Sequence, residues 1–263
     1  MSHSETLLQA VEESIHYGQT VPGQMHDLRI PGIMGRQSRL SHPLLNLIGA
    51  ARLSAENVDA TISRVKERFA RENRAFGWVT TPRSTPVDLN ARLEAAGLTK
   101  VDEMAGMVLT DLSQPIAANP AVTVDEVSPA EMLDYSELFA TAYGLPHDVT
   151  LQINLMMQNA EGIRFRYYVA RVEESPDPIS FGYMAYIPGE PVVLLGGAAT
   201  LKEYRGKGTY SSLVARRLAD ARADGKQAAV IQAVRSTSAP ICAKLGFREV
   251  VGLDFYAWIP PQA

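Results

Sequence analysis

Hydrophobic positions along this chain recur with two different periods, and the period changes from one segment to the next. Apolar residues spaced three or four apart predict helices, whereas short apolar runs between Gly, Pro and polar residues predict strands. The clearest helical segment is 55–71, where Val58, Ile62 and Val65 share one face. The predicted helices are 4–17, 55–71, 89–97, 129–142, 146–159, 209–225 and 238–245. The predicted strands are 75–80, 104–110, 122–127, 164–173, 179–187, 192–200, 227–234 and 248–258. This mixture predicts an α/β protein built on a mixed sheet.

The sequence PIAANP at 115–120 separates two such halves, because two prolines flank small and polar residues. We therefore expect an N-terminal domain over 1–114, a linker over 115–120 and a second domain over 121–263. The end of the first half echoes the end of the second, since Gly97-Leu98 follows a short helix as Gly246-Phe247 does. The first half is either a degenerate repeat of the second or an unrelated α/β lid.

A basic glycine loop, Arg205-Gly206-Lys207-Gly208, joins the apolar strand 192–200 to a helix. Two glycines allow a tight backbone turn, and the following helix directs its positive end and free N–H groups at one point. Such a loop binds a phosphate or pyrophosphate. It is not a P-loop, and Ser211 stands where a dinucleotide fingerprint needs its third glycine.

The loop resembles the acetyl-CoA-binding segment of the GNAT N-acetyltransferase superfamily, whose pattern is Q/R-x-x-G-x-G/A. Arg205 and Gly208 match the first and fourth positions, and Tyr210 stands at the sixth, where the family prefers Gly or Ala. The segment 239–247, APICAKLGF, is similar to the family's A-x-x-L-Y-x-K-L-G-F. The resemblance implies a GNAT acyl-CoA N-acyltransferase fold for the second half, with a partial GNAT-like half packed on it and forming part of the acceptor cleft.

The resemblance also implies how the donor is held. The amides from Arg205 to Tyr210, through Gly206, Lys207, Gly208 and Thr209, would bind the CoA pyrophosphate. Arg205 and Lys207 either add charge toward the phosphates or are ordinary surface residues. The strand 192–200 would splay from its neighbour, and backbone groups of Ala198, Ala199 and Thr200 would meet the pantetheine arm. A main-chain N–H near Ala198 would polarise the thioester carbonyl, and Gly196-Gly197 suits a bulge or close packing.

The catalytic groups are less clear, because the strand 192–200 lacks the glutamate that many relatives use as a base. His147 has a suitable ordinary pKa near 6.5, but it also stands at a predicted helix start. Relatives commonly protonate the departing thiolate with a tyrosine, and here that position is Cys242. Cys242 is an acid, a buried packing residue or an acetyl-accepting nucleophile. Tyr210 and Tyr256 are substitute donors.

Composition narrows the class of protein. The chain has 263 residues, 46% hydrophobic and 21% charged, with a formal net charge of −4, which disfavours a general nucleic-acid binder. No apolar run approaches the roughly 18 residues of a membrane span, and the N-terminus lacks the features of a secretory signal. A single cysteine cannot form an internal disulfide, so we expect a cytoplasmic protein that does not act at a membrane.

The predicted function is an acetyl-CoA-dependent N-acetyltransferase that transfers acetyl directly, in a ternary complex, to a small-molecule amine without a metal. Two alternatives stay open: a CoA-binding GNAT module with reduced catalysis, and an acyltransferase that uses another acyl-CoA. The acidic net charge slightly favours cationic acceptors such as polyamines or aminoglycosides. A homodimer is also open, although the N-terminal half can itself supply the partner surface.

Overall fold

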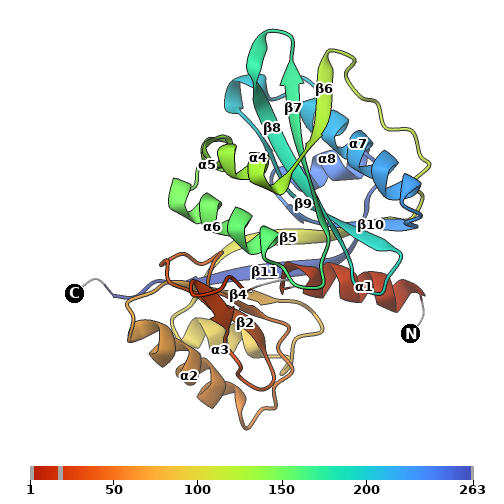
Figure 1. Ribbon diagram of the computed structural model, residues 1–263. Coiled ribbons are helices and arrows are strands. Elements are labelled where there is room, and N and C mark those ends of the chain that lie inside the picture. The colour runs from red at the N-terminus through yellow and green to blue at the C-terminus, as the bar shows by residue number, and fades with distance from the viewer. Residues whose placement is uncertain (1–2, 17–19, 262–263) are drawn as a thin grey trace.

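The computed structural model describes residues 3–16 and 20–261, and one mixed sheet runs through this part of the chain (Figure 1). Its strands are β1 (Met25–Asp27), β2 (Met34–Ser38), β3 (Leu47–Gly49), β4 (Phe76–Thr80), β5 (Thr99–Leu109), β6 (Val122–Val127), β7 (Phe165–Val172), β8 (Ser175–Tyr186), β9 (Val192–Thr200), β10 (Ala228–Val234) and β11 (Arg248–Trp258). The helices are α1 (His3–Glu13), η1 (Ser14–His16), α2 (Val58–Ala70), α3 (Leu89–Ala95), α4 (Pro129–Asp134), α5 (Ser136–Tyr143), α6 (His147–Gln158), η2 (Lys202–Tyr204), α7 (Thr209–Ala223) and α8 (Ser238–Lys244). The predicted α/β class with a mixed sheet is confirmed.

The strand order, β1-β2-β3-β4-β11-β5-β10-β9-β8-β7-β6, shows that the two halves exchange their last strands. The last strand of the N-terminal half, β5, pairs antiparallel with β10, whereas β11 pairs antiparallel with β4. β5 and β11 also pair with each other. Each half is therefore completed by a strand of the other, and the sheet is continuous across its centre (Figure 1).

Helices cover both faces of this sheet. On one face, α7 and α8 pack Leu213, Val214 and Cys242 against β9 and β10. The helices α2 and α3 extend the same layer over β4 and β11. On the other face, α1 packs Val11 against Val230 of β10, and α5 and α6 cover β7 and β8.

The predicted helix over 129–142 is divided into α4 and α5 at Tyr135. The cause is a buried amide from the neighbouring helix α6. Asn154 Nδ2 donates to the Met132 carbonyl oxygen (3.2 Å) and to Ser136 Oγ (3.0 Å). The Met132 carbonyl thus has a partner outside its own helix, and the chain turns there.

Other differences lie at element ends. Residues 175–178, expected as a turn, belong to β8, whose Ser175 pairs with Val172. β9 pairs with β8 only from Ser180 onward, so Pro176 and Pro178 occupy an open strand edge, where proline is tolerated. The short strands β1 to β3 were not predicted. The predicted helix 4–17 ends at Glu13 and continues as η1, and residue 17 lies outside the described residues.

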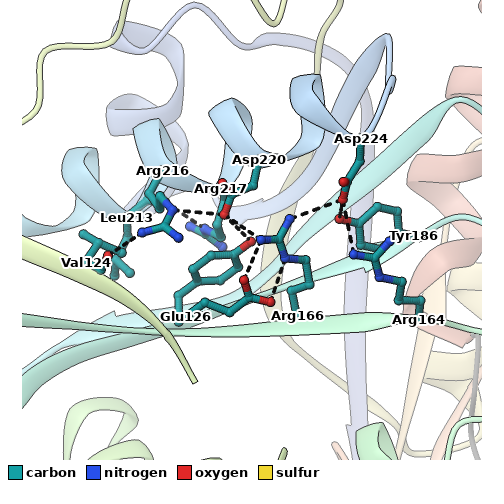
Figure 2. Close-up of polar contacts among 11 residues, drawn as sticks. Val124, Glu126, Arg164, Arg166, Tyr186, Leu213, Arg216, Arg217, Asp220 and Asp224 are labelled. Carbon is teal, nitrogen blue, oxygen red and sulfur yellow. Dashed lines mark hydrogen bonds and ion pairs between the residues drawn. The ribbon is translucent and has the colours of Figure 1, made fainter. Parts of the chain in front are cut away.

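A cluster of charged side chains fixes α7 to β6 and β7, as Figure 2 shows. Arg166 at its centre donates from Nε to Glu126 Oε1 (2.8 Å) and from Nη1 to Asp224 Oδ2 (3.2 Å). Asp220 accepts a hydrogen bond from the Tyr168 hydroxyl (3.0 Å) and pairs with Arg166 (3.1 Å). Since α7 begins directly after the glycine loop, this cluster also positions that loop.

Candidate functional site

The glycine loop opens α7 in the conformation that the sequence predicts. Gly206 and Gly208 have φ values of 76° and 77°, a left-handed region that strains other residues. Gly208 is the N-cap of α7, and no side chain caps the helix. The N–H groups of Thr209, Tyr210 and Ser211 find no acceptor among the described residues. An unsatisfied helix start of this kind is suited to bind an anion.

The linker holds this loop through Asn119. Its Nδ2 donates to the Lys207 carbonyl oxygen (2.8 Å), and its backbone N–H donates to Ser212 Oγ (2.9 Å). A Cβ at Gly208 would lie 3.2 Å from Asn119 Cβ, so the two segments are in tight contact. Sequence reasoning assigned the linker no role. An Asn between prolines was the available signal, since such residues favour local backbone bonding.

The two basic residues of the loop are used differently. Arg205 donates from Nε to the Thr200 carbonyl oxygen (3.0 Å) and from Nη2 to that of Ala142 (3.1 Å). Its guanidinium thus ties the loop to the ends of β9 and α5. Lys207 is exposed, and its Nζ lies 5.2 Å from the centre of the Tyr204 ring. Of the two, Lys207 is the one that can turn toward a bound phosphate.

The strand β9 separates from β10 in the predicted place. The two strands pair in parallel from Val192 to Leu194 only, whereas β9 continues to Thr200 along β8. Where β9 pairs with β8, Gly197 and Ala198 of β9 lie opposite a single residue of β8, so β9 has a β-bulge there. Gly197 has a φ of 28°. Beyond it, Ala199 and Thr200 pair again with β8. Ala198 thus lies at a bulged edge that opens between two strands.

The bulge requires glycine because a tyrosine ring lies against it. A Cβ at Gly196 would come within 2.7 Å of the Tyr183 hydroxyl oxygen and closer still to the ring carbons. A Cβ at Gly197 would meet the same ring at 2.3 Å. The predicted bulge at these glycines is present, and Tyr183 is the reason that both positions need glycine.

A cavity of about 290 Å³ lies at this opening, and residues of both halves line it. The N-terminal half contributes Ser14, Ile15, Arg36, Leu44, Leu47 and Met104. The C-terminal half contributes apolar residues of α5, α6 and β8, together with Tyr143, Tyr183, Ala198 and Tyr210. The N-terminal half therefore forms one wall of the candidate site.

Tyr210 and Cys242 form a pair at the wall of this cavity. The Tyr210 hydroxyl oxygen lies 3.4 Å from Cys242 Sγ, within hydrogen-bond distance for sulfur. Tyr210 lines the cavity, whereas Cys242 is fully buried behind it in the core. Burial raises the pKa of both groups, so they stay protonated at neutral pH. The bulky sixth residue of the loop pattern thus places a hydroxyl beside the position where relatives carry their tyrosine.

A buried arginine supports this pair and the bulge. Arg217 of α7 has no exposed surface, and its Nη1 donates to the carbonyl oxygens of Tyr183 (3.0 Å) and Gly196 (3.3 Å). Its positive charge lowers the pKa of Tyr210 and Cys242, against the larger effect of burial. Arg217 was missed in the sequence, where it looks like an ordinary helix-surface arginine.

The remaining predicted residues lie elsewhere. His147 is exposed at the first position of α6 and does not line the cavity. The Tyr256 hydroxyl donates to Glu94 (3.3 Å) in the core beneath α2 and α3. No Asp, Glu or His is among the described residues that line the cavity. The described residues also contain no cluster of His, Cys, Asp and Glu that could hold a metal ion.

No protein-family model matches the sequence, and no curated protein is significantly similar to it. Solved structures do resemble it. A GCN5-related N-acetyltransferase from Kribbella flavida has 16% identity, a TM-score of 0.66 and 91% coverage of each chain. A GCN5-related N-acetyltransferase from Sphaerobacter thermophilus has 13% identity and a TM-score of 0.62, and the match covers 88% of this chain and 82% of that one.

A tandem GNAT protein from the clavulanic acid biosynthesis pathway matches over the full length. It has 13% identity and a TM-score of 0.61, and the match covers 100% of this chain and 97% of that one. At these identities the likeness concerns the fold. Within the described residues, no helix has the length and apolar character needed to cross a membrane. The predicted resemblance is confirmed at the level of structure: the chain has the GNAT fold, and it matches a tandem GNAT protein from end to end.

Proposed function

We propose that this protein is an acetyl-CoA-dependent N-acyltransferase that transfers the acetyl group directly to an amine in the cavity. The observation that carries the proposal is one arrangement of three parts: an uncapped helix start with two left-handed glycines, a splayed and bulged strand, and a cavity lined by Tyr210 of that helix and Ala198 of that strand. The helix start can hold a pyrophosphate, the splayed strand can pair with an extended pantetheine arm, and the cavity can hold the acceptor.

The residues present fit CoA. The N–H groups of Thr209, Tyr210 and Ser211 would bind pyrophosphate oxygens, with Lys207 free to add charge. The β10-facing edge of Ala198, Ala199 and Thr200 would bind the pantetheine amides. Acetyl-CoA supplies the activated thioester, and an N–H of the bulge would stabilise the negative charge that develops on its carbonyl oxygen.

Tyr210 is the proposed proton donor. When the amine nitrogen bonds to the acetyl carbon, the carbon–sulfur bond breaks and the sulfur needs a proton. Tyr210 is the cavity-lining hydroxyl beside Cys242, and its raised pKa keeps it protonated. Cys242 is buried behind it, so its proposed role is to position the Tyr210 hydroxyl rather than to attack the thioester.

The amine is proposed to react in its neutral form and to lose its proton to solvent. The described lining of the cavity contains no carboxylate or imidazole to act as a base. A free alkylamine has a pKa near 10, so only a small fraction is neutral at pH 7. This makes turnover at neutral pH slow and strongly dependent on pH.

A longer acyl group is the second candidate for the donor. Much of the cavity wall is apolar, including Ile153, Met156 and Met157 of α6. A straight-chain acyl group could extend along that wall, and flexible Met side chains adapt to such ligands.

The test measures CoA release from acetyl-, butyryl-, hexanoyl- and octanoyl-CoA with a panel of amines. We expect release with acetyl-CoA and at least one amine, and a higher kcat/KM for a longer acyl-CoA would favour the second candidate. A Gly208→Val variant is expected to abolish acetyl-CoA binding in calorimetry, because valine is strained at φ 77° and would press on Asn119. Gly189→Val is the matched control, since Gly189 has a φ of 75° in a hairpin turn without close neighbours. CoA binding without any release would leave only the binding-module alternative.

A further inference from the structure

Arg217 of α7 is a buried cation that no acidic side chain of the described residues pairs with. It has no exposed surface, and none of the ion pairs in this part of the chain includes it. Its hydrogen bonds go to carbonyl oxygens, from Nε to Leu213 (3.1 Å) and from Nη1 to Tyr183 (3.0 Å) and Gly196 (3.3 Å). Its Nη2 is buried without a hydrogen-bond partner among the described residues.

An apolar residue would fill this position at a lower cost to the fold. The neighbours of Arg217 on the same face of α7 are Leu213, Val214 and Ala221, all buried in one apolar core. Burial lowers the pKa of Arg217, but a guanidinium stays charged at neutral pH, so the fold bears the cost of a desolvated and unpaired charge. Departures from an apolar core are expected where a side chain serves function rather than stability.

The groups on which this charge acts belong to the candidate site. They are neutral acids whose pKa the positive charge of Arg217 lowers, against the larger effect of burial: Tyr143, Tyr210 and Cys242. The two tyrosines line the cavity, whereas Arg217 does not. Arg217 follows Tyr210 by seven positions, about two helical turns, so both side chains leave α7 on the same side. The charge therefore acts on the site from behind its wall.

Arg217 also bonds a peptide group of the bulge. Its Nη1 bonds the carbonyl oxygens of Tyr183 on β8 and Gly196 on β9, so the guanidinium lies at the seam of these strands. The Gly196 carbonyl and the Gly197 N–H belong to one trans peptide group, whose N–H points away from its carbonyl. The Gly197 N–H thus points toward the side on which β9 has separated from β10. A carbonyl bonded by a cation makes the N–H of its own peptide group a stronger donor.

We infer that Arg217 is a positioning residue for acyl transfer, which orients and polarises the Gly197 N–H so that this N–H binds the thioester carbonyl oxygen. The inference rests on the proposed function and goes beyond it by assigning the source of the positive potential. When the amine nitrogen bonds to the acetyl carbon, an electron pair of the carbonyl bond moves to its oxygen. The pair returns when the carbon–sulfur bond breaks, and the sulfur leaves with the bonding electrons and takes a proton. The negative charge of these steps is the counter-charge that Arg217 lacks.

The test is the infrared carbonyl stretch of acetyl-CoA, isotope-labelled at the thioester carbonyl and bound to the full chain. Polarisation toward the oxygen weakens the carbonyl bond and lowers its stretching frequency. We expect a lower frequency in the wild-type complex than in free acetyl-CoA, and a return toward the free value in Arg217→Gln and Arg217→Met. Arg217→Lys, which keeps a charge, is expected to lie between them. If neither neutral variant folds, a wild-type frequency at or above the free value still overturns the inference, as does an equal frequency in the wild type and a folded neutral variant.

Kinetics separate this role from support of the fold. Arg217→Gln is expected to lower kcat by about tenfold and to leave the Kd for acetyl-CoA within about twofold, because the polarised N–H acts mainly on the transition state. A purely structural arginine would instead lower acetyl-CoA affinity together with kcat. Arg216→Gln is the matched control on the same helix, since the Arg216 side chain is 39% exposed and pairs with Asp220. Unchanged kcat in a folded Arg217→Gln variant, or an equal frequency shift in Arg216→Gln, would contradict the assignment.

CoA release distinguishes this inference from the proposed function. Release with an amine, but with a carbonyl frequency that Arg217 does not affect, would keep the function and overturn the inference. A frequency that depends on Arg217, without CoA release with any amine, would keep the polarised carbonyl site and reject transfer to an amine. Absence of acetyl-CoA binding to the wild type would reject both.

Discussion

We predict that the folded protein loses a large part of its stability in mild acid because His16 is buried in its neutral form. It lies at the end of η1, 5% exposed, and neither ring nitrogen has a hydrogen-bond partner among the described residues. A Cβ at Gly49 would come within 2.3 Å of its Nε2, so the ring is tightly enclosed. Burial, with a smaller effect from Arg36, lowers the pKa of His16 from 6.5 to about 3. The folded protein therefore keeps this histidine neutral.

The sign and size of this change in stability follow from proton linkage. Below pH 6.5 the unfolded chain binds a proton at His16 that the folded chain does not bind until about pH 3. Stability thus falls as the pH falls through this window. Between pH 7.5 and pH 5.0 the loss is about 2 kcal/mol, since each pH unit below 6.5 corresponds to about 1.4 kcal/mol.

The assay is urea unfolding of the wild type and of His16→Leu at pH 7.5 and pH 5.0. Leucine occupies a similar enclosed volume without titrating and removes two unpaired ring nitrogens, so the variant is expected to be as stable as the wild type at pH 7.5 or more stable. Between the two pH values it should lose about 2 kcal/mol less. His147→Leu, at an exposed histidine, is the control and should follow the wild type. Equal losses in wild type and His16→Leu would refute the assignment of this acid sensitivity to His16.

Three further predictions concern the site and its support. Tyr210→Phe keeps the ring and removes the hydroxyl, so kcat should fall by about tenfold to a hundredfold while acetyl-CoA affinity stays unchanged. In Cys242→Ala, kcat should stay within a few-fold of the wild-type value. A larger loss of kcat in Cys242→Ala than in Tyr210→Phe would make the cysteine the acid. The logarithm of kcat/KM should rise with a slope of about one up to the pKa of the acceptor amine, because the described cavity lining offers no base; a plateau from pH 7 would reveal one. The Arg166 hydrogen bond lowers the pKa of Glu126, so this contact stabilises the fold above pH 4.5 and is lost as the pH falls further. Urea unfolding of Glu126→Gln should therefore show a loss of up to about 1 kcal/mol at pH 7 and none near pH 3, and an equal loss at both would assign the effect to packing.

Local features of the site could be predicted from the sequence, because each depends on residues close together in the chain. The loop at Gly206 and Gly208, the bulge at Gly196-Gly197 and the apolar strand before them need only backbone freedom and short-range pattern. The departure of Tyr210 from the family's Gly or Ala was also visible in the sequence, but the residue that its hydroxyl contacts was not. The contact with Cys242 spans 32 positions and depends on how α7 and α8 pack.

The strand exchange could not be predicted for a more general reason. β5 and β11 both follow a short helix and a glycine, and both present apolar residues to the two faces of the sheet. An apolar pattern on both faces suits a central strand at either place, so the pattern alone does not choose which strand lies beside β10 and which beside β4. Arg36 was hidden for a related reason, since Arg36, Gln37 and Ser38 of β2 are polar in sequence and become buried only through packing against distant segments.

In the proposed enzyme, donor binding and part of acceptor binding fall to different halves of the chain, and the exchanged strands connect these halves. The glycine loop and Tyr210, which we propose as donor site and proton donor, belong to the C-terminal half, whereas the N-terminal half forms one wall of the cavity. Because β5 lies between β10 and β11, the wall that carries Arg36 is held against β9 by backbone pairing rather than by a surface contact alone. We therefore expect substitutions of cavity-lining residues of η1, such as Ile15, to affect the proposed acceptor side more than the glycine loop. The described residues of the N-terminal half contribute one wall of this cavity.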